Sequence, residues 1–295
     1  QDNNNMDLNV VDLKFQGELK WKPFKKVELS ALGAYKHSST TQSHSITDYS
    51  NQAWAFRAMD DATMRQANPW LYTDPENANT LPVSVLPVGG FYRETKYSMD
   101  SYDFRGTASY NDVYNENHIF NFFGGMEVNA VNRQRTWFNG VGMQYEMGML
   151  PAYEYQYFKQ GSEENAQYYT VERTRQREVS FFGTATYSYQ GKYTLNGTLR
   201  YEGSNKLGKS RSARWLPTWN LSAAWNAHEE KFWQPLLNYV SNMTLKASYS
   251  LTADRGPASA SNSRAIIQSY NTWRPFTSIK ESGLRVVNIE NQELT

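Results

Sequence analysis

The sequence contains no cysteine, which excludes disulfide bonds, thiolate metal sites and cysteine nucleophiles. It also has no run of about 18 apolar residues, so no transmembrane helix is expected. Strands that cross a membrane are not excluded, because they alternate apolar and polar residues. Neither positive nor negative charge predominates in the sequence. The 30 basic and 29 acidic residues give a net charge of +1, which offers no basis for nucleic-acid binding.

Catalytic motifs are also lacking. There is no Gly-rich phosphate loop, Gly-x-Ser-x-Gly elbow or zinc motif. Adjacent carboxylates occur at Asp60–Asp61 and Glu163–Glu164, but we expect ordinary solvated charges there rather than a glycosidase pair. The histidines show no metal-ligand spacing and are expected at the surface: His37, His44, His118 and His228. We therefore predict no enzyme, no cofactor and no metal site.

Aromatic residues are abundant in a chain that is otherwise poor in apolar residues. Of the 295 residues only 39% are hydrophobic, the mean hydropathy is −0.73, and 21 Tyr and 9 Trp are present. The segment 179–201 shows how they are placed. From Val179 to Tyr189 every second residue is apolar or small, and after 190–192 the alternation restarts at Tyr193. This pattern predicts two antiparallel strands joined by a tight turn.

The same alternation recurs elsewhere in the chain. Further strands are predicted at 13–21, 27–35, 102–110, 120–130, 215–225 and 243–252. We predict an all-β fold of about eight antiparallel strands. No regular helix is predicted, although the long loops have room for short ones. "FRGTASY" (104–110) and "FFGTATY" (181–187) share one pattern, but no fixed repeat period is found.

The predicted connections alternate in length. Short connections lie near 22–26, 111–118 and 190–192, and an intermediate one lies near 227–242. Long connections lie near 37–95, 131–172, 203–214 and from 253 onward. Compact soluble domains mostly use connections of about 4–6 residues. Short turns at one end and long loops at the other are typical of outer-membrane barrels.

The apolar face of these strands could contact either lipid or a protein core. The length of the strands and the positions of their aromatic residues favour lipid. Val179 to Tyr189 spans about 33 Å of strand, which reaches roughly 25 Å in height when tilted, the height of a barrel's apolar band. Tyr187, Tyr189 and Tyr193 gather at the short turn, whereas Phe181 and Tyr201 lie at the other end. Tyr and Trp prefer membrane interfaces. The alternative is a large soluble β-sandwich or propeller with one wet face.

The segment "RYEGSNKLG" at 200–208 resembles a motif of SusC/RagA-like TonB-dependent outer-membrane transporters, Arg-x-Asp-Gly-Ser-Ser-x-Phe-Gly. This sequence departs from the motif at Glu202, Asn205 and Leu207. The neighbouring segments keep the family's order: "QGKYTLNGTLR" precedes, and "WLPTWNLSAAWNAHEEKFW", "LKASYSLTAD" and the closing "NIENQELT" follow. The resemblance covers about 120 residues by motif. The first 170 residues resemble the family mainly in pattern.

The resemblance implies active nutrient import across the bacterial outer membrane. The family's architecture is a 22-strand barrel with extracellular loops, plugged by an N-terminal domain. TonB energises it, a SusD-like surface lipoprotein lids it, and the cargo is an oligosaccharide or an oligopeptide. The chain starts at Gln1 rather than Met. About eight strands with two bare edges cannot span lipid alone, because each unpaired backbone group there costs several kcal/mol. We therefore expect residues 1–295 to belong to one barrel domain in the middle of a longer transporter. The signal peptide, plug, TonB-contacting segment and closing strands are expected outside this chain.

Two sets of residues are candidates for function. A charge facing lipid at mid-depth costs about 2–4 kcal/mol, so charged residues on the strands are predicted to face the lumen and to pair with one another or with the plug. These are Asp103, Arg105, Glu127, Arg200, Glu202 and Lys246. Loop aromatics are predicted to pack within loops or against a partner, and secondarily to contact cargo. These are Trp54, Phe56, Trp70, Tyr72, Trp137, Phe138, Tyr153, Tyr155, Tyr157 and Trp273.

Two other functions remain open at this point. One is a soluble or surface-exposed β-sandwich that binds glycans through loop Trp and Tyr. The other is a passive porin, which a plug domain encoded upstream would exclude. The sequence does not separate glycan from peptide cargo, because aromatic loops suit both.

Overall fold

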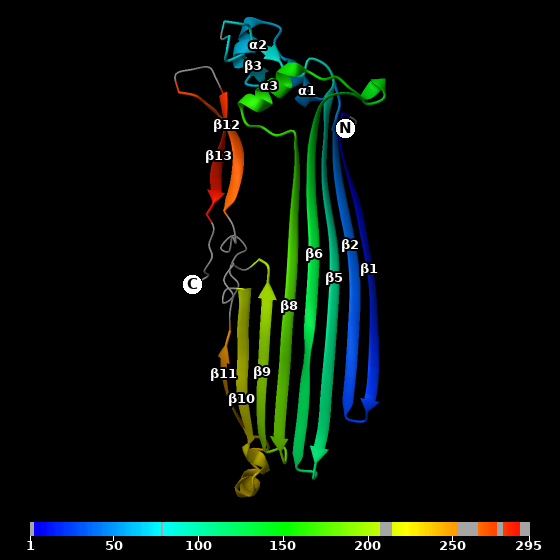
Figure 1. The fold of residues 1–295 in the computed structure, drawn as a ribbon, viewed down its shortest axis with the longest axis vertical. Coiled ribbons are helices and arrows are strands. Elements are labelled where there is room, and N and C mark those ends of the chain that lie inside the picture. Colours follow the sequence, from blue (N-terminus) through cyan, green and yellow to red (C-terminus); the bar gives the residue numbers. More distant parts are fainter. Residues whose placement is uncertain (1–2, 78, 207–213, 253–264, 276–279, 290–295) are drawn as a thin grey trace.

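The computed structural model describes residues 3–77, 79–206, 214–252, 265–275 and 280–289. Its main feature is one antiparallel sheet whose long strands run side by side in chain order (Figure 1). The strands are β1 (Asn4–Phe24), β2 (Val27–Ile46), β5 (Gly90–Tyr114), β6 (His118–Gln144), β8 (Tyr169–Tyr189), β9 (Tyr193–Ser204), β10 (Trp215–Asn226) and β11 (Thr244–Leu251). The predicted path of about eight antiparallel strands is confirmed.

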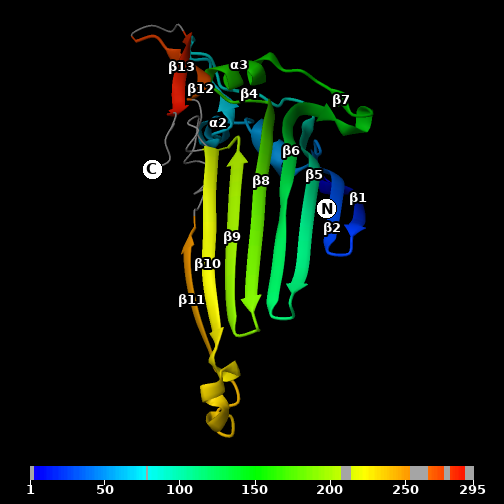
Figure 2. The ribbon, with the colours of Figure 1, turned by 60° about the horizontal axis from the view of Figure 1, so that its bottom comes forward.

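The two ends of the sheet differ as the connection lengths predict. Tight turns close one end at 25–26, 115–117 and 190–192. Gln190 and Gly191 both adopt positive φ in the last of these turns. The connection 227–243 projects from the same end and contains the short 3-10 helices η2 (Ala227–Glu229) and η3 (Lys231–Leu236) (Figure 2). The other end carries the long connections.

The long connections contain regular structure of their own. The connection between β2 and β5 holds the helices α1 (Asn51–Arg57) and α2 (Ala62–Ala67) and the short hairpin β3 (Leu71–Tyr72) and β4 (Val83–Ser84). The connection between β6 and β8 holds η1 (Tyr145–Met147), β7 (Leu150–Pro151) and α3 (Tyr155–Glu163). A separate hairpin, β12 (Ile266–Trp273) and β13 (Lys280–Asn288), follows β11 in the chain.

The strand limits predicted from alternation were too narrow. Residues assigned to the loops 37–95 and 131–172 continue the ladder, so that His37 pairs with Asp100 and Trp137 with Thr170. The turn predicted at 111–118 is only 115–117. The cause is chemical: beyond about Tyr35 both faces of the strands are polar. Polar side chains on both faces remove the period-two signal, whereas the backbone hydrogen bonds continue.

The register separates the side chains into two faces. Tyr110, Phe122, Ala185, Gly197 and Leu221 lie opposite one another in one row across the strands. Their neighbours along each strand point to the other side, where the next row contains Asn121, Thr186, Asn196 and Ser222. We call the two sides the apolar face and the polar face.

The apolar face forms a band of limited height. On β2 it runs from Val27 to Tyr35, nine residues that span about 26 Å along the strand. Aromatic pairs mark its edge toward the long connections: Tyr35 with Tyr102, 5.1 Å between ring centroids, and Tyr201 with Trp215, 4.8 Å. At the tight-turn edge His118 lies 5.0 Å from Tyr189, ring to ring. Nothing in the described chain covers this band, and Phe122 remains 46% exposed.

The buried core lies at the end of the sheet rather than on it. Ile46, Ala53, Leu86 and Phe91 pack together where the connection 47–89 folds over the ends of β2 and β5. Arg57 holds this connection in place, since its guanidinium donates to the carbonyl oxygens of Leu86 at 3.0 Å and Asp48 at 3.1 Å, and to that of Gly89. A cluster of buried apolar residues and satisfied carbonyls fixes the connection as a folded cap.

The two long connections bind each other through polar contacts. The hydroxyl of Tyr72 donates to Glu163 at 2.9 Å, and Lys159 forms an ion pair with Asp74 at 2.7 Å. Burial and the Glu163 hydrogen bond raise the pKa of Tyr72 to about 12. The Lys159 hydrogen bond lowers the pKa of Asp74 below its ordinary value of 3.8. α3 is thereby fixed to the β3–β4 hairpin. We use the word cap for both connections together, residues 47–89 and 145–168.

Gly125 gives a test of the sheet register. A Cβ there would overlap the carbonyl oxygen of Gly106 on the neighbouring strand, whereas a Cβ on Gly33 meets nothing within 4 Å. We expect Gly125→Ala to destabilise the protein by about 1–3 kcal/mol through overpacking. Gly33→Ala, the matched control, should change stability by less than about 0.5 kcal/mol. Heat denaturation of the full-length protein in detergent measures both. Equal melting temperatures for the two variants would contradict the register.

Asp74 gives a pH prediction. Because its pKa in the folded protein is lowered, its contribution is present above about pH 4 and is lost as pH falls through the folded pKa. We expect Asp74→Asn to weaken hydrogen-exchange protection of α3 at pH 7, and the difference between wild type and variant to shrink as pH falls through the lowered folded pKa of Asp74. Comparing both proteins at each pH cancels the intrinsic exchange rate.

Asp60→Asn is the control, since Asp60 is exposed in the same connection and has no hydrogen bond or ion pair to the described residues. A difference between wild type and Asp74→Asn that does not shrink as pH is lowered below the ordinary carboxyl value of 3.8 would show that the carboxylate charge is not what holds α3.

Candidate functional site

The polar face carries a cluster of four charges at the height of the apolar band. Glu127 on β6 accepts from Arg105 of β5 at 3.1 Å and from Arg200 of β9 at 3.3 Å. Arg200 also pairs with Glu202 at 2.9 Å, and Ser180 of β8, between β6 and β9, donates to Glu127 at 3.2 Å. The register explains the geometry, since Arg105, Glu127, Ser180 and Glu202 occupy one row. Two positive and two negative charges balance within the cluster.

All six strand residues predicted to face a lumen lie on the polar face. The cluster joins four of them, and its Arg105 also lies 5.4 Å from the ring centre of Phe182. Asp103 accepts hydrogen bonds from the amide of Asn129 and from Ser101, the latter at 3.1 Å. Lys246 on β11 shares the face and has no hydrogen bond or ion pair to the described residues. That this face lines a lumen stays a prediction.

The aromatic candidates of the first connection fall into two groups. Phe56 lies between Trp70, 5.6 Å away, and Phe91, 5.2 Å away, measured between ring centroids. Tyr72 is only 6% exposed. Both residues pack the cap, as loop packing predicts. Trp54 on α1 and Trp70 before β3 are 63% and 47% exposed and present ring surface to the outside.

The candidates of the second connection are less uniform. Trp137 and Phe138 were predicted in a loop, and this is wrong, because both lie in β6 and pair with β8. Tyr153, which precedes α3, and Tyr155, its first residue, are 77% and 70% exposed. Tyr157 is tied down, since its hydroxyl accepts from Asn139 at 2.9 Å. Trp273 is the last residue of β12, and its side chain lies outside the described part of the chain.

The exposed rings share one end of the molecule. α1, α2, β3 and α3 lie together beyond the ends of β2, β5, β6 and β8 (Figure 1). Trp54, Trp70, Tyr153 and Tyr155 are therefore carried by segments of the same cap, held there by Arg57 and by the Lys159–Asp74 pair. Flat exposed rings on a rigid support can stack on a sugar face or pack against a protein surface.

The sequence analysis missed two features of the described chain. One is the role of Arg57, which no local motif signals. The other is a stripe of exposed arginines on β8, Arg173, Arg175 and Arg177, on the apolar side of the sheet but beyond the edge of the band. Its signal was present in "VERTRQREV" (171–179), where arginine recurs at every second position.

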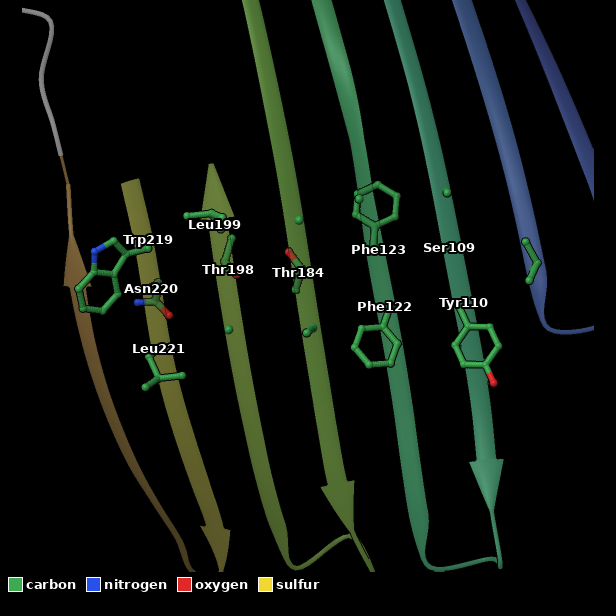
Figure 3. Close-up of a pocket in the computed structure, with 16 residues that line it drawn as sticks. Ser109, Tyr110, Phe122, Phe123, Thr184, Thr198, Leu199, Trp219, Asn220 and Leu221 are labelled. Carbon is green, nitrogen blue, oxygen red and sulfur yellow. The ribbon is translucent and has the colours of Figure 1, made fainter. Parts of the chain in front are cut away.

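The apolar band contains a shallow groove of about 730 Å³. Small residues of β5, β6, β8 and β9 form its floor, and Phe122, Leu199 and Leu221 rise at its sides (Figure 3). Its small residues are Ala108, Gly124, Gly183, Ala185 and Gly197.

Two further searches of the described chain gave negative results. Within residues 3–289, gaps excepted, no three His, Asp or Glu side chains are grouped to hold a metal ion. No helix in that same part of the chain is long and apolar enough to span a membrane.

Comparison with known proteins was made on sequence and on structure. No family model matches the sequence. TonB-dependent receptor P39 of Formosa agariphila is 27% identical over 160 residues, 52% of this chain and 14% of the receptor. TonB-dependent receptor SusC of Bacteroides thetaiotaomicron is 30% identical over 86 residues, 29% of this chain and 8% of the receptor.

Solved structures agree on the fold. A structure of the RagAB peptide transporter matches 99% of this chain and 27% of its own with a TM-score of 0.68 and 17% identity. The RagAB peptide importer in its closed-closed state gives a TM-score of 0.68 at 15% identity, with 100% of this chain and 27% of the importer chain covered. At this identity the likeness concerns fold alone, and it confirms an antiparallel sheet that forms part of a larger barrel.

The chain thus spans about a seventh of the first curated relative and about a quarter of the structural neighbours. These relatives are receptors and transporters rather than enzymes, which agrees with the prediction that this chain is not an enzyme. The resemblance drawn from "RYEGSNKLG" and its neighbouring segments is confirmed: the chain is similar to a barrel segment of the SusC/RagA-like TonB-dependent transporters.

Proposed function

We propose that this chain is part of the wall and outer loops of a transporter that imports nutrients across the bacterial outer membrane. The observation that carries the proposal is the two-faced sheet. One face exposes an aromatic-edged apolar band, and the other carries the balanced charges around Glu127 at the same height.

The apolar band fits lipid better than water. Monomeric soluble proteins rarely expose contiguous apolar patches larger than a few hundred Å². Here Phe104, Phe122, Leu199 and Leu221 of four different strands are each 46–56% exposed on one face. On β8 the band runs from Val179 to Tyr189, about 33 Å along the strand, which reaches roughly 25 Å in height once the strand is tilted, the height of a barrel's lipid-facing girdle.

The edges of the sheet support a larger barrel. β1 and β11 end the strand path, so each presents a row of backbone donors and acceptors with no partner strand among the described residues. In lipid each unpaired group costs several kcal/mol. We propose that residues 1–295 belong to a single barrel domain, and that the remaining strands and a plug are encoded elsewhere in the full protein.

The polar face is the proposed lumen wall. Charges that face a water-filled or plug-filled lumen avoid the cost of about 2–4 kcal/mol that they would meet in lipid. The cluster around Glu127 neutralises itself, so it offers a plug a surface that is polar but not strongly charged. TonB is proposed to act on that plug, outside this chain.

The cap is the proposed extracellular end. A SusD-like lipoprotein is the proposed lid, and the exposed rings Trp54, Trp70, Tyr153 and Tyr155 are the proposed contacts to that lid or to cargo. Cargo is an oligosaccharide or an oligopeptide. The RagAB complex is named a peptide transporter and importer, and exposed aromatic rings serve either class.

Intact mass spectrometry of the native protein tests the proposal. The protein is extracted from outer membranes in detergent, and we expect a species much larger than the 34.1 kDa of this chain, with a lipoprotein co-purifying. A folded 34.1 kDa species that needs no detergent would overturn the barrel and favour a soluble glycan-binding β-protein.

Paired tryptophan substitutions separate contact from packing. We expect Trp54→Ala with Trp70→Ala to weaken binding of cargo or lipoprotein by roughly 10-fold or more, since buried aromatic anchors contribute about 2 kcal/mol or more at interfaces. Trp54→Ala alone should change the melting temperature little, because this ring is 63% exposed. Trp70→Ala also removes a ring stacked on Phe56, so the double variant should melt somewhat lower. Isothermal titration with purified lipoprotein, and then with oligosaccharide and oligopeptide pools, identifies the bound class.

Tyr72→Phe is the matched control for that experiment. It removes a hydrogen bond to Glu163 inside the cap and leaves the exposed rings in place. It should lower protection of α3 without abolishing binding. If Trp54→Ala with Trp70→Ala binds every ligand as the wild type does, these rings are not the contact surface.

A further inference from the structure

The arginine stripe of β8 is not explained by import. Arg173, Arg175 and Arg177 occur at every second position, so all three point to the side of the sheet that carries the apolar band. All three are exposed. Arg177 lies four residues, or about 13 Å along the strand, from Phe181 of the band. The stripe therefore begins where the apolar band ends, on the side of the long connections.

The stripe has only neutral hydrogen-bond partners among the described residues. Arg177 donates to the side-chain oxygen of Asn132 at 2.7 Å and to the backbone carbonyl oxygens of Val131 and Gln176. Arg173 donates to Gln134 at 3.0 Å. None of the three arginines forms an ion pair within that part of the chain.

The nearest acid in these rows is already engaged. Asp100 lies two strands from Arg175 in the same row, with Asn132 between them. Its carboxylate accepts from the hydroxyl of Tyr35 at 2.9 Å and lies 2.8 Å from the ring nitrogen of His37. Asp100 lines one pocket with Arg173, Arg175 and Arg177, so three positive charges face one carboxylate there and the stripe keeps a net positive charge among the described residues.

Arginines on the polar face of the same strands are treated differently. Arg105 and Arg200 bind Glu127, and Arg135 pairs with Glu172 at 3.3 Å. These three arginines have carboxylate partners, although Arg133 on the same face bonds to the neutral Gln176 at 3.2 Å. The arginines of the stripe have no ion pair within the described chain. An external anion would complete the stripe.

The groove in the apolar band crosses the strands from β2 to β10, and on β8 the side chains of Val179 and Phe181 lie between it and Arg177 on the same face. Gly183 of its floor is six residues beyond Arg177 on β8, or about 20 Å along the strand. That length is comparable to an extended acyl chain. The groove is lined by small residues between larger rings (Figure 3), so it can seat a hydrocarbon chain beside the sheet.

We propose that this surface binds one anionic membrane lipid, with its phosphate on Arg173, Arg175 and Arg177 and an acyl chain in the groove around Gly183. The proposal rests on the membrane location proposed above. Charge complementarity selects the phosphate. Continuity with the apolar band selects a lipid rather than a free anion, because a free phosphate would gain nothing from the groove.

Lipid titration of the full-length, delipidated transporter tests the proposal. Native mass spectrometry counts bound phosphatidylglycerol and, separately, zwitterionic phosphatidylcholine. We expect the wild type to prefer phosphatidylglycerol, and Arg175→Gln with Arg177→Gln to lose at least about tenfold in affinity for it, from roughly fivefold per arginine. Affinity for phosphatidylcholine should change little.

Arg133→Gln with Arg135→Gln is the matched control. These arginines lie on β6 beside the stripe but on the polar face, where Arg133 pairs with Thr174 and Arg135 with Glu172 in the register. The control should keep the wild-type preference for phosphatidylglycerol. An equal loss in both double variants, or no loss in the stripe variant, would overturn the proposal.

Gly183→Val tests the groove separately. A Cβ at this position meets nothing closer than 4.0 Å, so the sheet should accept valine. We expect weaker phosphatidylglycerol binding with the arginines intact. Unchanged lipid binding in Gly183→Val, together with displacement of the lipid by inorganic phosphate, would assign the stripe to free anions and refute the lipid site.

The same preparations separate this inference from the proposed function. If the wild type is extracted from outer membranes and co-purifies with its lipoprotein, but shows no lipid preference, the lipid site fails and the transporter stands. If the wild type is soluble without detergent, the proposed function fails, and the lipid site fails with it.

Discussion

The continuous antiparallel ladder is the constraint on which the rest of the structure depends. From β1 to β11 each strand pairs with the next in chain order, so the alternation of side chains is kept in phase across the sheet. One shift of a single residue would move every side chain of a strand to the other face. The apolar band, the charge cluster around Glu127 and the arginine stripe all exist because that phase is kept.

The ladder also explains why the core lies where it does. Neither face of the sheet is covered by another layer of the described chain, so its side chains remain exposed, as the proposed positions of lipid and lumen require. Packing is concentrated in the cap, where Ile46, Leu86 and Phe91 are almost fully buried. There Arg57 satisfies carbonyl oxygens that no strand could reach. Strands are stabilised by hydrogen bonds along their length, and the connections by a small apolar core.

Strands were predicted correctly from the sequence where one of their faces is apolar, and they were missed where both faces are polar. The segments 179–189 and 193–201 were predicted from alternation alone, and both lie within observed strands. Trp137 and Phe138 were misplaced because their stretch of β6 has polar residues on both sides, which leaves no period to detect. The contacts between Lys159 and Asp74 join residues 85 positions apart, and no local pattern encodes such a pair.

The same reasoning shows why the arginine stripe was visible but not interpreted. Period two in "VERTRQREV" predicts that the arginines share a face, but it does not say which face, since the intervening residues are also polar. The structure settles the face. Val179 pairs with Val128 and Arg177 with Ala130, so the arginines lie on the same side of the sheet as the apolar band. The register fixes the surroundings of these arginines: they share the face of the apolar band, and Asp100 is the acid in their rows. Those surroundings are what the proposed lipid phosphate and acyl chain are argued from.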